Sequence, residues 1–153
     1  MSEQYDQPTI ELFGLWRTTM DATNLIQARL EELLKSNGGL SLGDYSVLLT
    51  LAQTPHGYMK LGELARQTSF SAARVTYMMH SLERRGFVER KASEQDGRIV
   101  FAHMTPRGRR VFNSCHAAYC EHIEQWCLSC VSPDEADVLH RVFSRIAQRL
   151  RDN

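Results

Sequence analysis

The spacing of apolar residues changes at Gly86, and this change limits what the chain can fold into. Before Gly86, apolar residues recur three or four positions apart, which is the period of an amphipathic helix. Two segments after it, 87–91 and 99–104, read as strands instead. The loop between them contains Asp96-Gly97, a strong turn signal for a β-hairpin. We therefore expect a largely helical chain interrupted by one charged hairpin.

The helical segments have recognisable starts and stops. The first runs over 9–36 and ends at a pair of glycines. Ser41 and Ser132 are residue types that cap a first helical turn, and Thr105 precedes a proline in the same way. Gly86 occupies the place of a glycine just after a helix. The expected later helices are 41–52, a short one around 61–65, 71–85, 105–129 and 132–149.

The order of these elements suggests a known arrangement. Two short helices joined by a three- or four-residue turn, followed by a charged hairpin, outline a winged helix-turn-helix. We predict a mainly α (α+β) fold with a DNA-binding domain at 39–104 and a two-stranded hairpin as its wing. Segments 1–38 and 105–153 carry broad apolar faces far from this module in sequence. We expect them to form a helical dimerisation region with N- and C-terminal parts.

Charge is distributed unevenly along a chain of 153 residues whose formal net charge is zero. Residues 60–110 carry a net charge of +6 between two acidic flanks. A basic middle of this kind fits a polyanionic partner such as nucleic acid. The apolar content of 42% argues against a disordered chain, and the apolar runs are too short to cross a bilayer. Glu3 and Asp6 come before the first apolar segment, unlike a secretory signal, so we expect a cytoplasmic protein.

The helix expected over 71–85 has one apolar and one polar face. At 100° per residue, Val75, Met78, Met79 and Leu82 share the face that packs inward. The opposite face fits the major groove, where arginine can bind two acceptors on guanine. At the hairpin, an arginine can enter a minor groove, and Asp96 can either aim it or brace the turn. The candidate DNA-binding residues are Ser71, Arg74, Thr76, Tyr77, His80, Arg84, Lys91, Asp96 and Arg98, with Arg90 also expected to face phosphates.

Several motifs in this order resemble the multiple-antibiotic-resistance-regulator (MarR) family of bacterial transcription factors. They are the runs 61–65, 74–76 with Ser69, 82–90, 96–98 and 104–108, and, upstream, 15–17 and 39–48. The Asp-Gly-Arg wing followed by a Thr-Pro helix start is the most specific of them. Two positions depart from the family pattern: Tyr77 stands where arginine is frequent, and Met104 where leucine is frequent.

The resemblance implies a homodimer that binds a pseudo-palindromic operator in double-stranded DNA, most often as a repressor. It also implies a response to a small aromatic effector bound between the dimerisation and winged regions. On the resemblance alone, Trp16, Met20, Tyr45 and Leu49 are candidates for that pocket, although each also fits ordinary core packing. No cofactor, metal or membrane partner is expected, and no pattern of nucleophile and base suggests an enzyme.

Four cysteines in the last third of the chain support an alternative function. Cys115, Cys120, Cys127 and Cys130 could form a redox or metal site, with His116 or His122 as further ligands. Cys127 and Cys130 have the spacing of a C-x-x-C pair, but no second pair accompanies them. We favour the interpretation that these thiols pack as small apolar side chains and stay reduced. A helical interaction module that has lost DNA binding is a third possibility, which the basic middle argues against.

Overall fold

Capping side chains start the helices where the sequence predicts. The computed structural model describes residues 7–68 and 70–152, so Glu3, Asp6 and Ser69 lie outside the described residues. Ser41 and Asp44 form a reciprocal capping box at the start of α2, and Ser132 and Glu135 form another at the start of α6. Ser71 caps α4 by accepting a hydrogen bond from the backbone N–H of Arg74.

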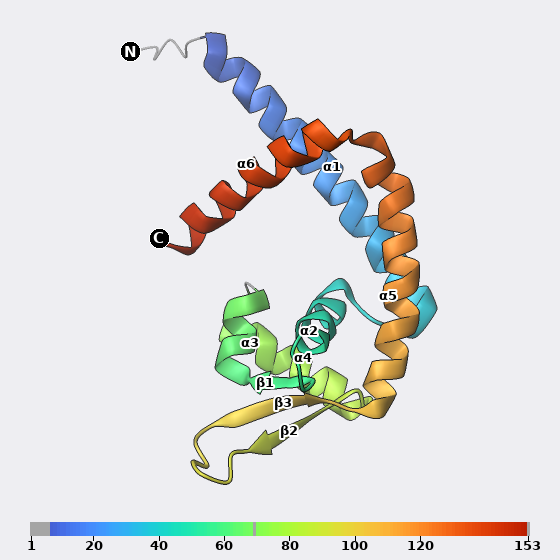
Figure 1. The fold of residues 1–153 in the computed structure, drawn as a ribbon, viewed down its shortest axis with the longest axis vertical. Helices are drawn as coiled ribbons and strands as arrows, with labels where there is room; N and C mark the ends of the chain where they lie inside the picture. Colours follow the sequence, from blue (N-terminus) through green and yellow to red (C-terminus); the bar gives the residue numbers. More distant parts are fainter. Residues whose placement is uncertain (1–6, 69, 153) are drawn as a thin grey trace. The chain divides into compact units, whose positions relative to one another are not determined.

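The order of elements confirms the predicted fold class (Figure 1). The helices are α1 (Gln7–Gly38), α2 (Leu42–Ala52), α3 (Leu61–Thr68), α4 (Ala72–Arg84), α5 (Pro106–Trp126) and α6 (Pro133–Arg151). A short 3-10 helix, η1 (Leu128–Cys130), follows α5, so this helix ends three residues earlier than expected. The strands are β1 (Tyr58–Lys60), β2 (Val88–Ala92) and β3 (Val100–Met104).

The sheet has one more strand than the sequence predicts. It is antiparallel with the order β1-β3-β2, so β3 is central and the hairpin strand β2 lies at an edge. Tyr58 of β1 pairs with His103 of β3, and Lys60 pairs with Phe101. The wing is the predicted hairpin of β2 and β3, and β1 joins it from a distant part of the chain.

The core of the winged part is apolar and closed. Leu48, Leu51, Leu64, Met79 and Leu82, from α2, α3 and α4, are fully buried. From the sheet, Val88 and Ala102 are buried in the same core. The predicted inward face of α4 is confirmed, since Val75, Met78, Met79 and Leu82 are all buried. This packing leaves the opposite side of α4 exposed.

The start of α5 is fixed tightly to the end of α4. Thr105 donates its hydroxyl hydrogen to the carbonyl of Gly86 at 2.7 Å and accepts from the N–H of Gly108 at 3.0 Å. Gly86 has a positive φ of 72°, the left-handed conformation that ends a helix. A side chain at position 108 would overlap the backbone of Phe87, so only glycine fits there.

The chain divides into two compact units, with the boundary between His116 and Ala117, inside α5. The first unit contains α1 to α4, the sheet and the beginning of α5. The second contains the rest of α5, η1 and α6. In the part of the chain that the structure describes, no helix has both the length and the apolar character needed to cross a bilayer.

Candidate DNA-binding surface

The outward face of α4 presents polar and cationic side chains. Ser71, Arg74, Thr76, Tyr77, His80 and Arg84 are all exposed, as the helical period predicts. Tyr77 is the large aromatic side chain of this face, with 74% of its surface accessible. Arg84, in the last turn, also interacts favourably with the negative end of the helix dipole. The helix therefore offers one face for packing and one for a partner.

Two members of this face already make hydrogen bonds within their own helix. Ser71 accepts from the backbone of Arg74 at 3.2 Å, and Thr76 donates to the carbonyl of Ala72 at 2.9 Å. The Ser71 hydroxyl therefore has a structural role as the helix cap. Arg74 and Tyr77 extend from the same first turns of α4, next to this cap.

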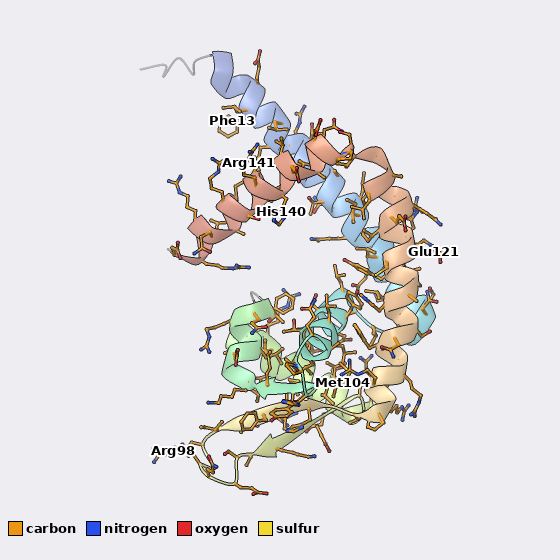
Figure 2. All side chains as sticks on the ribbon, in the orientation of Figure 1. Phe13, Arg98, Met104, Glu121, His140 and Arg141 are labelled. Atoms are coloured by element: carbon orange, nitrogen blue, oxygen red, sulfur yellow. The ribbon has the colours of Figure 1, made fainter. Side chains whose placement is uncertain are left out.

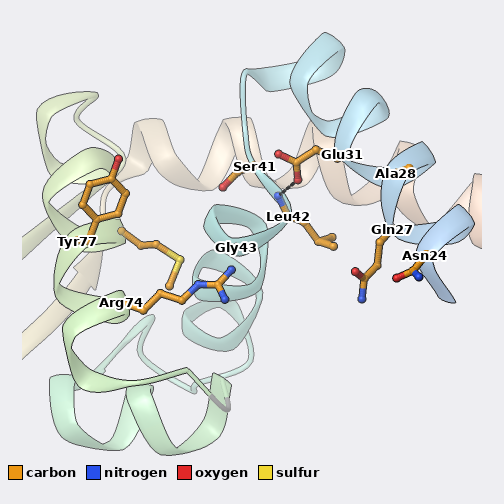
Figure 3. A pocket seen from close by; sticks show the side chains of 10 residues that line it. Asn24, Gln27, Ala28, Glu31, Ser41, Leu42, Gly43, Arg74 and Tyr77 are labelled. Atoms are coloured by element: carbon orange, nitrogen blue, oxygen red, sulfur yellow. Dashed lines mark hydrogen bonds between the residues drawn. The ribbon is translucent and has the colours of Figure 1, made fainter. Parts of the chain in front are cut away.

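Arg74 borders a cavity on the side of α4 that faces α1 and α2. Its guanidinium carbon lies 4.3 Å from the ring centroid of Phe70, a cation–π contact. The cavity has a volume of about 510 Å³, and Figure 3 shows Arg74 directed toward Gly43 within it. Its walls are Asn24, Gln27, Ala28 and Glu31 of α1, Ser41, Leu42 and Gly43, and Arg74, Tyr77 and Met78 of α4.

Glu31, in the wall of this cavity, is held by a hydrogen bond. Its carboxylate accepts from the backbone N–H of Leu42 at 2.7 Å, at the start of α2, and lies 3.4 Å from Lys35. The positive end of the α2 dipole favours a carboxylate at this place. The cavity is thus lined by one anion engaged in hydrogen bonding and by one arginine.

The tip of the wing is braced by Asp96. Its Oδ1 accepts from the backbone N–H of Arg98 at 3.0 Å, and Ser93 closes the loop with a backbone hydrogen bond to Ile99 at 2.8 Å. Of the two roles considered for Asp96, the structure shows the bracing of the turn. The side chain of Arg98 is exposed and projects from the tip (Figure 2).

The strand that leads to the tip holds two cations in different settings. Lys91 is exposed and forms a surface ion pair with Glu89 at 2.6 Å. Arg90 is half-buried and is bound by Glu83 of α4, with its Nη2 2.8 Å from the carboxylate. The expectation that Arg90 faces phosphates therefore does not match its surroundings. The pairing was missed because the two residues belong to different elements, seven positions apart.

The candidate effector residues do not meet in the cavity beside Arg74. Tyr45 is buried, stacks on Phe112 with ring centroids 5.9 Å apart, and lies 2.8 Å from Nδ1 of His116 through its hydroxyl. Trp16 is 52% exposed on α1, and Met20 and Leu49 are half-buried. None of the four belongs to the walls of that cavity.

The cysteines differ in their surroundings. Cys115 is buried, as the packing interpretation predicts, with its sulfur beside Gly38 at the end of α1, and burial raises the pKa of its thiol. Cys120 and Cys130 are exposed and Cys127 is half-buried. These three thiols are therefore not packed in the core of a single chain, unlike Cys115. No group of three or more metal-ligating side chains occurs among residues 7–68 and 70–152.

The helices and the sheet together define a winged helix-turn-helix. A capped second helix exposes its polar face, a braced hairpin follows it, and a third strand completes the sheet. Residues 40–100, which include α2 to α4 and most of the wing, match the sequence profile described as the MarR family. This segment of the chain therefore carries a MarR-family domain.

Individual relatives agree with this assignment. The chain is 27% identical over 153 residues to the transcriptional repressor MprA of Escherichia coli, covering 97% of this chain and 83% of MprA. It is 32% identical over 83 residues to YkoM of Bacillus subtilis, an uncharacterized HTH-type transcriptional regulator, with 54% of this chain and 53% of YkoM covered.

Solved structures show the same fold over most of the chain. The MarR family regulator AbsC of Streptomyces coelicolor superposes with a TM-score of 0.87 at 25% identity, covering 91% of this chain and 93% of AbsC. Sco3205 from the same organism, crystallised in complex with DNA, gives a TM-score of 0.86 at 24% identity, covering 89% and 88%.

Proposed function

We propose that this chain is a homodimeric transcription regulator that binds double-stranded DNA at a pseudo-palindromic operator and represses the genes beside it. The observation that carries this proposal is the exposed face of α4, where Arg74 and Tyr77 stand free of the core and Arg98 projects from the adjacent wing. The names of two relatives agree with it, since MprA is called a transcriptional repressor and Sco3205 was crystallised with DNA.

Each element has a distinct part in this proposal. The exposed face of α4 enters the major groove, where Arg74, Tyr77, His80 and Arg84 meet base edges and phosphates. Ser71 and Thr76 contribute at the start of that helix, and Lys91 contacts a phosphate from the strand. Arg98 enters the neighbouring minor groove from a turn that Asp96 holds rigid. Base contacts give sequence preference, while phosphate contacts give affinity and register.

Dimerisation is supported by apolar surface that the described chain leaves uncovered. α1 exposes Leu12, Phe13, Leu15, Trp16 and Leu25, and α6 separately exposes Val138, Leu139, Phe143, Ile146 and Leu150. Several large apolar side chains exposed on one helix are typical of an association surface. We propose that segments 1–38 and 105–153, which precede and follow the winged domain at 39–104 in the sequence, form the dimerisation region. A two-fold dimer places two copies of α4 about one DNA turn apart, ~34–36 Å.

Release by a small ligand is supported by the cavity beside α4. Arg74 and Tyr77 belong both to its walls and to the proposed DNA surface. A bound molecule there would engage side chains that DNA also needs, so the two would compete. We therefore place an effector in this cavity in preference to the position of Tyr45, whose ring is part of the core. A second region that contacts the effector remains a candidate role for Trp16, Met20 and Leu49.

The proposal is tested by fluorescence anisotropy with a labelled duplex from the region upstream of this protein's own gene. We expect Arg74→Ala and Arg98→Ala each to weaken binding by about 1–3 kcal/mol, and Arg98→Ala also to reduce the salt dependence by about one ion. Arg29→Ala, on the exposed surface of α1, removes the same charge and serves as the control. Equal effects of all three substitutions would contradict the assigned surface.

A further inference from the structure

One carboxylate joins the recognition helix α4 to the strand that leads into the wing. Oε1 of Glu83 accepts from the backbone N–H of Arg90 at 3.1 Å. Oε2 of the same side chain accepts from Nε of Arg90 at 3.1 Å and lies 2.8 Å from its Nη2. The Glu83 carboxylate therefore binds both the backbone N–H and the guanidinium of Arg90. Because the backbone is bound, the contact fixes the strand as well as the flexible side chain.

The position of Arg90 in the sheet explains why this bond is available. β2 is an edge strand, and Arg90 lies opposite Ala102 of β3. In an antiparallel pair, alternate residues direct their N–H groups away from the partner strand. The N–H of Arg90 is such a group, since it bonds to Glu83 and not to β3. The contact thus covers the free edge of the wing at its base.

His80 extends this contact toward the proposed DNA surface. Its Nδ1 lies 3.3 Å from Nη2 of Arg90. A guanidinium has no acceptor, so Arg90 is the donor of this contact and Nδ1 of His80 is the acceptor. His80 belongs to the exposed face of α4, one turn before Glu83. The three residues, Glu83, Arg90 and His80, are called the wing clamp below.

We infer that Glu83 and Arg90 are positioning residues for DNA binding, and that the wing clamp sets the angle between α4 and the hairpin. This inference rests on the proposed function, since it concerns how two DNA-contacting elements act together. Helix and wing must reach adjacent grooves at the same time. A wing already held at the correct angle loses less conformational freedom when Arg98 enters its groove.

Electrostatics alone makes the opposite prediction, and the two explanations can therefore be separated. Glu83 carries a negative charge beside a surface that meets a polyanion. If that charge only repelled DNA, replacing it with a neutral side chain would strengthen binding. If Glu83 positions the wing, the same replacement weakens binding despite the lost repulsion.

The test is a double-mutant cycle on the full-length protein, measured by anisotropy with the upstream duplex. The variants are Glu83→Gln, Arg98→Ala and the double variant. We expect Glu83→Gln to weaken binding about fivefold when Arg98 is present and to have little effect when Arg98 is alanine. Glu89→Gln is the matched control, because this exposed glutamate on β2 pairs only with the neighbouring Lys91 among the described ion pairs. It should leave the affinity unchanged or raise it.

Three results would overturn the inference. The first is stronger DNA binding by Glu83→Gln than by wild type. The second is a loss of DNA affinity from Glu83→Gln that is the same with arginine and with alanine at position 98. The third is a loss of DNA affinity in Glu89→Gln as large as that in Glu83→Gln. A loss caused by general destabilisation would appear in both backgrounds, so the cycle also separates positioning from stability. Melting temperatures of all variants are compared beforehand so that only folded protein is titrated.

Hydrogen exchange, measured without DNA, tests the wing clamp independently of DNA binding. Hydrogen exchange should be faster in Glu83→Gln at the amide of Arg90 and across 88–104, and unchanged there in Glu89→Gln. Unchanged exchange in Glu83→Gln would refute the clamp even if DNA binding were strong. If the wild-type protein does not bind the duplex, the proposed function is wrong. The hydrogen-exchange result still shows whether the wing clamp holds the hairpin.

Discussion

Asp44, at the start of α2, forms a salt bridge of 3.0 Å with Arg85, which caps the end of α4. The same carboxylate oxygen accepts from the N–H of Ser41 in the capping box. Arg85 also donates to the carbonyl of Gly39 at 2.6 Å and lies over the ring of Phe87. One ion pair therefore ties the beginning of α2 to the end of the recognition helix.

Replacing Asp44 with asparagine should lower the free energy of unfolding by about 1–3 kcal/mol. Asp44 is buried, so its loss leaves a partly covered guanidinium without its counter-charge and weakens the cap of α2. Urea denaturation measures the difference. Glu63→Gln, on α3, provides a control whose carboxylate accepts a hydrogen bond from exposed Gln67. A cost no larger than that of the control would show that the pair adds little stability.

Gly108→Ala should destabilise the protein strongly, by about 2–4 kcal/mol. The new Cβ would overlap the carbonyl of Phe87, which is backbone and cannot move aside without shifting α5 from the end of α4. The matched substitution is Gly97→Ala at the wing tip, where nothing lies within 4 Å of the added atom. Thermal melting of the two variants gives the comparison, and similar melting temperatures would contradict the close approach.

The bond between Glu83 and Arg90 should make stability depend on pH in the acid range. Burial acts to raise the pKa of Glu83, but the hydrogen bonds and charge of Arg90 outweigh it, so the pKa lies below the ordinary 4.5. A lowered pKa means that the stabilisation is complete above the unfolded value and is lost as the pH falls through the folded value. Near neutral pH, the wild-type protein should therefore unfold at a higher urea midpoint than Glu83→Gln. In acid, the two midpoints should become equal. A difference that persists at the lowest pH would exclude the ion pair as its source.

The four thiols should react at different rates with a cysteine reagent. Cys115 is fully buried and burial raises the pKa of its thiol, so little thiolate forms and the reagent has no access. Cys130, exposed beyond α5, should react much faster. Mass spectrometry after timed alkylation identifies each site. Fast labelling of Cys115 in folded protein would mean that the contact between α5 and α1 opens readily.

A charge on the apolar face of α6 should prevent self-association. Phe143→Asp introduces a carboxylate among Leu139, Ile146 and Leu150, and we expect monomers in analytical ultracentrifugation together with a large loss of DNA affinity. Ser144→Asp adds the same charge on the polar side of this helix and should remain dimeric. A Phe143→Asp protein that still dimerises would exclude this face from the dimer interface.

Local signals in the sequence were enough to predict most elements. Ser41, Ser71 and Ser132 cap helices because a hydroxyl can satisfy a free N–H of the first turn, whatever the rest of the chain does. The exposed face of α4 follows from its helical period. β1 was missed because its three residues show no alternation of their own, and they become a strand only by pairing with β3, about forty positions away.

The sequence alone therefore determined the helices, the wing and the polar face of α4, since caps, turns and periodicity act between near neighbours. Tertiary structure decided what each charged side chain does. Arg90 looks like Lys91 in the sequence, yet it is bound by Glu83, while Lys91 stays at the surface. Arg74 borders a cavity only because α1 and α2 pack beside it. These roles depend on distances between elements, and those distances are set when the apolar core closes.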